Sequence, residues 1–394
     1  MLKAEGLKKI FFSGIFRRKS TGAVDNVSFS IKKGECLGLI GESGSGKTTV
    51  GKLIARLIEP TGGQVYINGQ DIFKLKPLEL KKFRQKVQII FQEPDSALDP
   101  RWKIAKSMAE PFKLHRLAPE AEISKRVREL INIVGLHPEH LNRFPFELSG
   151  GQLQRISLAR VLALEPELIV ADEPTSSLDV SVQAQVLCLL KELQRKYKLT
   201  ILFISHDLNV ARRMCDRVAV MYRGTIVEEG GTETVFEEAR HPYTRSLLDA
   251  LLIPDPDIRR TKSNKTVYLS DVRPVEDFPG DNGCVFGHRC LIKEPLCLEQ
   301  KPALVQLTKM HRVACHKAEL LKSFGKAAAL HGRGGPGQDR AAPGGRRVNG
   351  CLHSALNPSD GGPKSGHAPA VSPGLRPPAV PGDRQEVGVV RIPG

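Results

Sequence analysis

The chain has 394 residues, of which 40% are hydrophobic and 26% charged, and its formal net charge is +16 at pH 7. This length and composition are typical of a folded protein with a sizeable core and exclude a wholly disordered chain. No stretch approaches the ~20 uninterrupted apolar residues of a membrane-spanning helix, and early lysines argue against a secretory signal. A role at a membrane would therefore depend on partner proteins.

The basic excess is scattered along the chain, in pairs such as Lys8-Lys9 and Arg259-Arg260. Grooves that bind nucleic acid usually interleave basic with aromatic residues, and aromatic residues make up only 5% of this chain. We therefore expect a solvated basic surface that favours an anionic membrane face and does not bind nucleic acid.

Residues 24–40 carry the alternating apolar side chains of strands and run directly into a glycine-rich loop. Residues 48–57 then have helical spacing, which places one set of apolar residues on a single face: Val50, Leu53, Ile54 and Leu57. Strand, loop and helix in this order are the context that a phosphate-binding loop requires.

The loop has the full phosphate-binding pattern over residues 41–48. Its glycines let the backbone curl so that successive amide groups point at phosphates. Lys47 supplies a cation to the same oxygens, and Thr48 offers a hydroxyl to Mg²⁺. The residues expected to bind the nucleotide here are Gly41, Glu42, Ser43, Gly44, Ser45, Gly46, Lys47, Thr48 and Thr49.

A further strand is predicted over residues 87–91, and Gln92 follows it. The amide of Gln92 could reach Mg²⁺ or an attacking water. Residues 96–165 are more charged and have helical spacing, so they predict a helical insert.

Near the end of this insert, the segment Leu148-Ser-Gly-Gly-Gln152 precedes a helix predicted over residues 152–164. Ser149 would cap that helix, and a capped helix N-terminus attracts anions. The segment therefore forms a second anion site, which one domain does not need for one ATP.

Two short apolar strands, predicted over residues 168–171 and 200–204, both end at polar residues. A buried carboxylate at Asp172 would be costly unless Mg²⁺ lies near it, and the adjacent Glu173 could accept the proton of an attacking water. His206 could contact the γ-phosphate, although a lone histidine is more often a capping or core residue. Strands that alternate with helices indicate a mostly parallel sheet covered by helices.

From about residue 254 the composition loosens, and a group of cysteines follows: Cys284, Cys290, Cys297 and Cys315. Four thiolates are enough for an iron–sulfur cluster or for zinc, where His288, His311 or His316 could substitute. The alternative is four reduced cysteines in a small extension. Residues 325–394 are rich in Gly and Pro without periodicity, which predicts a disordered tail or an out-of-frame sequence.

Together these motifs resemble the ATP-binding cassette (ABC) family of transporter ATPases over residues 1–253. The resemblance implies an α/β fold: a P-loop NTPase (RecA-like) core with a mostly parallel sheet, an antiparallel β subdomain and a helical signature subdomain. The Cys-rich C-terminal extension would cover residues 254–324 and the disordered tail residues 325–394. In that family the Leu148–Gln152 signature meets the ATP held by the other subunit of a head-to-tail dimer.

The resemblance also implies a role for each matching residue. Thr48, Gln92 and Asp172 would hold Mg²⁺, Glu173 would be the general base, and His206 would be the switch histidine. Other residues would contact ATP across the dimer or communicate across it: Ser149, Gly151, Gln152 and Asp179. An aromatic near the N-terminus would stack on adenine, with Phe11 as the candidate and Phe12 as its alternative.

Two segments resemble the oligopeptide/dipeptide/nickel importer branch: Phe91–Pro100 and His241–Leu248. The four late cysteines match that branch's C-terminal extension, where some members are thought to carry a [4Fe–4S] cluster. Ser177 stands where Ala is frequent, and Val285 and Leu291 stand where Pro is frequent.

This branch implies an ATPase that works at the cytoplasmic face of the inner membrane as a peripheral subunit. Its expected partners are two multi-span permease subunits, a second ABC ATPase (identical or sister) and an extracytoplasmic solute-binding protein. The expected cargo is oligopeptides or dipeptides, and nickel or another small solute is the alternative.

Two other functions fit the sequence less well. A non-transport ATPase of ribosomes or DNA usually has two cassettes or a long coiled coil, whereas this chain has one phosphate-binding loop and no heptad run. A non-catalytic regulatory subunit is disfavoured by the intact Lys47, Glu173 and His206.

Overall fold

The computed structural model describes residues 1–13, 19–250 and 282–323. All of them belong to one of the chain's two compact units, Met1–Arg340. The domain boundary expected near residue 254 and the tail expected over residues 325–394 lie outside the described residues.

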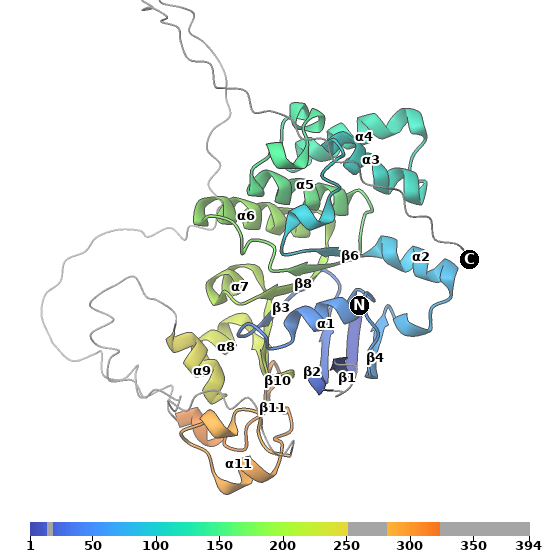
Figure 1. The fold of residues 1–394 in the computed structure, drawn as a ribbon. Helices are drawn as coiled ribbons and strands as arrows, with labels where there is room; N and C mark the ends of the chain where they lie inside the picture. Colours follow the sequence, from blue (N-terminus) through green and yellow to red (C-terminus); the bar gives the residue numbers. More distant parts are fainter. Residues whose placement is uncertain (14–18, 251–281, 324–394) are drawn as a thin grey trace, which may run out of the picture. The chain divides into compact units, whose positions relative to one another are not determined.

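A central sheet of eight strands, in the order β11-β12-β10-β9-β3-β8-β7-β6, forms the framework of this unit (Figure 1). The strands from β6 to β9 in this order run parallel, and β10, β12 and β11 continue the sheet in antiparallel pairs. Their bounds are β3 Cys36–Ile40, β6 Val87–Ile90, β7 Leu168–Asp172, β8 Thr200–Ser205, β9 Arg217–Tyr222, β10 Thr225–Gly231, β11 Val305–Thr308 and β12 His311–Val313.

A second sheet is antiparallel and has the order β2-β1-β4-β5. It corresponds to the antiparallel β subdomain that the family resemblance implied. Its strands are β1 Leu2–Ser13, β2 Lys19–Ile31, β4 Gly62–Ile67 and β5 Gln70–Asp71.

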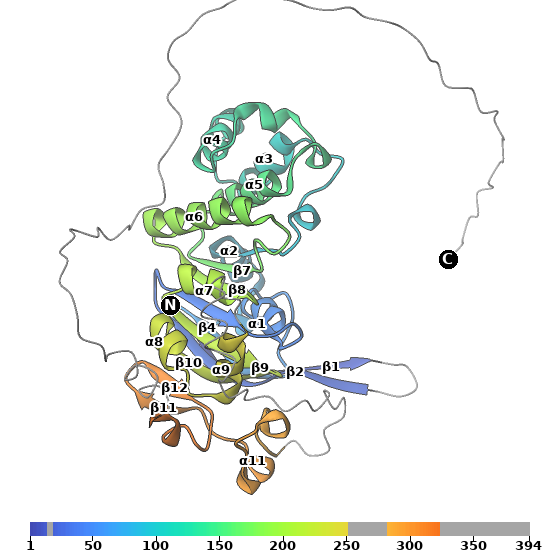
Figure 2. The same ribbon diagram turned by 90° about the vertical axis from the view of Figure 1, so that its left-hand side faces the viewer.

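Helices cover the central sheet and form the insert. The insert helices α3, α4 and α5 lie together in both ribbon views (Figures 1 and 2). None of the helices in the part of the chain that the structure describes is long and apolar enough to cross a membrane. The bounds are α1 Lys47–Ile54, α2 Pro77–Lys86, α3 Ile104–His115, α4 Glu120–Ile133, α5 Gly150–Leu162, α6 Val180–Tyr197, α7 Leu208–Met214, α8 Thr232–Glu238, α9 Pro242–Asp249 and α11 Pro295–Glu299.

Separate apolar clusters pack against the two faces of the central sheet. In one, Phe203 of β8 joins Leu190 of α6. In the other, Val170 of β7 joins Leu53 of α1 and the antiparallel sheet. Because both faces are covered, the central strands are continuous apolar runs, as expected for a parallel sheet. The insert helices have a cluster of their own.

The predicted strands, the helical insert and the mostly parallel sheet are all confirmed. One helix is shorter than predicted, because α1 ends at Ile54. Arg56 adopts a left-handed backbone with φ 51°, which a continuous helix does not tolerate. Leu57, predicted on the buried face, is instead 52% exposed.

Residues 282–323, here called the C-terminal extension, continue the central sheet. Strand β12 pairs with β10, and β11 pairs with β12. At this junction His311 Nε2 lies 2.7 Å from the buried Glu228 Oε1, and Arg312 pairs with Glu229. The sequence predicted a small extension but not its place in the sheet.

Candidate nucleotide site

The phosphate-binding loop connects β3 to the N-terminus of α1 and depends on glycine at two positions. Gly41 has φ 154° and Gly46 has φ 100°. A Cβ on Gly41 would lie 2.1 Å from the backbone oxygen of Met221, and a Cβ on Gly46 would lie 2.2 Å from that of Ala23. Both neighbours are backbone atoms, so neither position has room for a side chain.

Lys47 follows this loop as the first residue of α1 and is 4% exposed. Its Nζ donates to the carbonyl oxygens of Gly41, at 2.9 Å, and Glu42, at 2.8 Å. Burial lowers the pKa of Lys47, while the nearby carboxylates of Glu173 and Asp172 oppose that shift. Negatively charged phosphate oxygens in the loop would stabilise the ammonium form further.

Oxygen ligands suited to Mg²⁺ meet beside the loop. Thr48 Oγ1 donates to Asp172 Oδ1 at 3.0 Å, from α1 to the end of β7. Burial raises the pKa of Asp172, as expected for a carboxyl group that needs a cation. Gln92, which follows β6, lines a cavity beside the loop that Thr48 also lines. Mg²⁺ prefers a hydroxyl, a carboxylate and an amide oxygen completed by phosphate and water, so these residues fit the ion.

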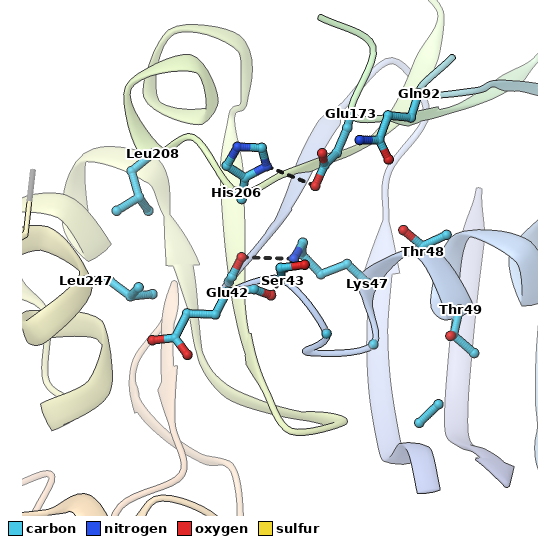
Figure 3. A pocket seen from close by; sticks show the side chains of 14 residues that line it. Glu42, Ser43, Lys47, Thr48, Thr49, Gln92, Glu173, His206, Leu208 and Leu247 are labelled. Atoms are coloured by element: carbon cyan, nitrogen blue, oxygen red, sulfur yellow. Dashed lines mark hydrogen bonds and ion pairs between the residues drawn. The ribbon is translucent and has the colours of Figure 1, made fainter. Parts of the chain in front are cut away.

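Glu173 and His206 face each other at the ends of neighbouring strands (Figure 3). His206 Nδ1 lies 3.0 Å from Glu173 Oε1. Glu173 has φ 47°, and its amide donates to Ile204 O at 3.0 Å. His206 is not the cap of α7, because Asp207 accepts the first helical N–H groups there. This arrangement suits a base that is oriented by a histidine.

Apart from Asp172, which lies behind Thr48 and is not among the described lining residues, these groups line one cavity of about 650 Å³. Of the residues predicted for the nucleotide, the cavity lining includes most of the loop together with Gln92, Glu173 and His206 (Figure 3). The sequence reasoning missed three apolar lining residues, Ala23, Leu208 and Leu247. Leu247 lies in the segment 241–248, which resembles the importer branch, so the sequence did single out the stretch of chain that contains it.

The adenine-stacking candidate is not brought into this cavity. Phe11 lies on β1 and is 42% exposed, with Lys9 Nζ 5.2 Å from its ring centroid. Among the described residues, neither Phe11 nor Phe12 lines the cavity. The stacking role of Phe11 stays a prediction.

The signature segment forms a separate helix N-terminus. Ser149 caps α5: its Oγ accepts from the amide of Gln152 at 3.3 Å, and Gln152 Oε1 accepts from the amide of Ser149 at 3.0 Å. Asp179 caps α6, where its carboxylate accepts from the amides of Ser181 and Val182. A Cβ on Gly151 would lie 2.2 Å from Val182 Cγ1, so this glycine lets α5 approach α6 closely. Neither cap is among the described residues that line the cavity.

The four late cysteines line one small cavity of about 20 Å³. Burial raises the pKa of Cys284 to about 11 and that of Cys315 to about 12, so both thiols are protonated at neutral pH. Within residues 1–13, 19–250 and 282–323, no three His, Cys, Asp or Glu side chains are arranged to hold a metal ion. The predicted iron–sulfur or zinc site is therefore not supported among these residues.

A glycine-rich loop between a buried strand and a helix, with a carboxylate and a histidine at neighbouring strand ends, defines a P-loop ATPase. The family within this class follows from comparison with known proteins. The family model described as ABC transporter matches residues 24–176. A second model, described as oligopeptide/dipeptide transporter, C-terminal region, matches residues 227–297.

Similar proteins match over almost their whole length. The oligopeptide transport ATP-binding protein AppF of Bacillus subtilis is 46% identical over 321 residues, which are 80% of this chain and 97% of that protein. OppF of the same organism, also named an oligopeptide transport ATP-binding protein, is 48% identical over 279 residues, covering 70% of this chain and 90% of OppF. The chain therefore belongs to the ABC transporter ATPases, in the oligopeptide/dipeptide branch, and it is an ATPase, as predicted.

Solved structures agree with the fold. The ATP-binding cassette MJ0796, in a dimeric post-hydrolysis state with ADP and phosphate, has a TM-score of 0.54 and 33% identity over 59% of this chain and 99% of its own. A similar match is cbiO1 from Clostridium perfringens, part of the ABC transporter complex cbiONQ, with a TM-score of 0.54 and 29% identity over 60% of this chain and 90% of its own. The predicted ABC cassette fold is confirmed.

Proposed function

We propose that this chain hydrolyses ATP in a head-to-tail pair of cassettes and thereby drives the uptake of oligopeptides or dipeptides. Two facts support this cargo. AppF and OppF are both named oligopeptide transport ATP-binding proteins. In addition, the family model for the C-terminal region of oligopeptide/dipeptide transporters matches this chain. The observation that carries the ATPase half is the meeting of Lys47, Glu173 and His206 around one cavity.

In the proposed reaction, Lys47 and the loop amides bind the β- and γ-phosphates of ATP. Thr48, Asp172 and Gln92 would hold Mg²⁺, which neutralises charge on the phosphate oxygens. Glu173 accepts the proton of the attacking water. His206 orients the Glu173 carboxylate through their 3.0 Å contact and reaches toward the γ-phosphate.

The proposed dimer accounts for the second helix N-terminus. Ser149, Gly151 and Gln152 begin α5 away from the ATP cavity of their own chain, so they are free to meet the γ-phosphate bound by a partner cassette. Asp179, at the start of α6 next to them, would communicate across the same interface. Hydrolysis would open the pair, and the helical insert after Gln92 would pass the motion on.

In the proposed complex, the chain is a peripheral subunit at the cytoplasmic face of the inner membrane. Its partners would be two multi-span permease subunits, an identical or sister ABC ATPase, and an extracytoplasmic solute-binding protein. Nickel or another small solute is the alternative cargo. The described residues contain no group of three side chains arranged to hold a metal ion, and no step of this mechanism is assigned to a [4Fe–4S] cluster.

Purification of the tagged chain from gently solubilised native membranes tests the proposal. We expect two multi-span permease subunits, a second cassette ATPase and a solute-binding protein to copurify. Uptake of a labelled peptide into cells should then fall when Lys47→Ala replaces the wild-type chain. Recovery of ribosomal or DNA-bound partners without a membrane subunit would contradict the transport function and leave the ATPase intact.

A further inference from the structure

We propose that the C-terminal extension is a working part of the ATP site. Tyr243, in the helix that precedes the extension, and Arg289, within it, hold Glu42, the second residue of the phosphate-binding loop. Both would be positioning residues for ATP binding. This inference rests on the proposed ATPase function and adds a role for residues outside the cassette motifs.

The first contact is a hydrogen bond to the loop backbone. Tyr243 lies in α9, and its hydroxyl accepts from the amide of Glu42 at 3.0 Å. The Tyr243 side chain is 0% exposed, and burial raises its pKa above the ordinary range, so it remains a neutral phenol. With water excluded, this hydroxyl is the partner that the structure gives to that loop N–H.

The second contact comes from the extension itself. Arg289 Nη1 lies 3.7 Å from Glu42 Oε2, and the same nitrogen donates to the hydroxyl of Tyr222 at 3.3 Å. In Figure 3 the Glu42 carboxylate points away from Lys47, toward the strands of the extension. Arg289 thus links the loop to β9 as well as to its own segment.

An aromatic cluster fixes the position of both contacts. Phe286 of the extension is 1% exposed, and its ring centroid lies 5.5 Å from Tyr222 and 5.7 Å from Tyr243. Tyr222 and Tyr243 are themselves 4.4 Å apart. Because interiors are close-packed, the Tyr243 hydroxyl cannot shift without moving Phe286. The extension therefore sets where that hydroxyl lies.

Glu42 is held from two sides, and this connects the extension to the phosphates. Its carbonyl oxygen accepts from Lys47 Nζ at 2.8 Å, while its amide and carboxylate face Tyr243 and Arg289. A shift of Glu42 would move one of the oxygens that place the lysine. We therefore expect loosening of these contacts to weaken ATP binding more than it slows hydrolysis.

The test compares ATPase kinetics and thermal unfolding of the full-length wild type with those of Tyr243→Phe. The variant leaves the Glu42 amide without its partner while keeping the ring packed, so KM for ATP should rise roughly 3- to 10-fold with kcat little changed. Tyr66→Phe is the matched control, because it removes a hydroxyl that bonds to Gln64 outside the cavity. Its KM should equal that of the wild type.

A double-mutant cycle tests the arginine contact separately. Arg289→Gln and Glu42→Gln should each raise KM, roughly 2- to 3-fold because the pair is partly exposed, and together should raise it no further than either alone. This non-additivity would not arise from general loss of fold. Unchanged KM in Tyr243→Phe, or additive effects in the cycle, would overturn the inference. Absence of ATPase activity in the wild type would instead contradict the proposed function.

Discussion

Glu173, the proposed general base, has an unusual backbone conformation. Its φ of 47° is uncommon for a residue other than glycine, and such strain persists where surrounding contacts fix it. Here the amide bond to Ile204 O and the contact with His206 do so. The sequence singled out Glu173 as a candidate general base, because a carboxylate after a buried strand is conspicuous, and the structure places it at the cavity. It did not predict φ, which depends on the neighbouring strand.

Gly46→Ala should abolish ATP binding. The new Cβ would lie 2.2 Å from the backbone oxygen of Ala23, and the alanine would have to adopt the φ of 100° that Gly46 has. The loop would therefore have to rearrange. Equilibrium binding of a fluorescent ATP analogue measures the effect. Gly69→Ala is the control: φ there is 82°, but the space around the Cβ is open. It should cost about 1–2 kcal/mol of stability and leave ATP affinity unchanged.

Asp172→Asn should stabilise the nucleotide-free protein at neutral pH. Burial raises the pKa of Asp172 above its ordinary 3.8. The folded protein therefore loses stability as pH rises from 3.8 to the raised folded value, and stays less stable above it. Asparagine does not ionise, so the variant's advantage in Tm should grow over this window and vanish below it.

Mg-ATP supplies the second arm of this test. It should raise the Tm of the wild type, in which the carboxylate is available to the cation, and raise that of Asp172→Asn less. A variant that melts below the wild type at neutral pH without nucleotide would contradict the burial argument.

At the scale of elements, local patterns predicted most of the cassette. Apolar runs predicted the buried strands β7 and β8. Ser149 predicted a capped helix, but α5 covers Gly150–Leu162 and so lies two residues earlier than the predicted 152–164. Two features depended on distant contacts. Strands β11 and β12 are short and mostly polar, and they join the sheet only through pairing, β12 with β10 and β11 with β12. The contact of Tyr243 with the loop joins residues far apart in sequence.

The junction of α5 with α6 yields a prediction at this scale. Gly151→Ala would place a Cβ 2.2 Å from Val182 Cγ1 and push the signature helix away from α6. Overpacking of this kind costs about 1–3 kcal/mol, so we expect a lower Tm and weaker ATP-dependent dimerisation in analytical ultracentrifugation.

Adding Val182→Ala should restore both properties, because it removes the methyl group that the new Cβ would strike. If the single variant dimerises like the wild type, the close approach of these helices is not needed for the signature to act.

The molecule as a whole combines an ATP cavity, a second helix N-terminus outside that cavity, and a C-terminal extension whose strands continue the central sheet. The sequence motifs predicted the first two because each is a local run of residues. The cysteine site was predicted from the number of thiols and from the family resemblance, and neither fixes how thiols face one another. In the structure the four cysteines line a cavity of about 20 Å³, and burial raises the pKa of Cys284 and Cys315.

The central claim is that Glu173 activates water for hydrolysis of ATP between two cassettes. Glu173→Gln tests it most directly, with turnover, ATP binding and mass in solution measured on one preparation. Glu165→Gln is the matched control, since Glu165 also has positive φ, at 48°, but is not among the described residues that line the cavity. We predict that Glu173→Gln binds ATP, loses about 10²- to 10⁴-fold in turnover, and accumulates as an ATP-bound dimer. Wild-type turnover in Glu173→Gln would contradict the account.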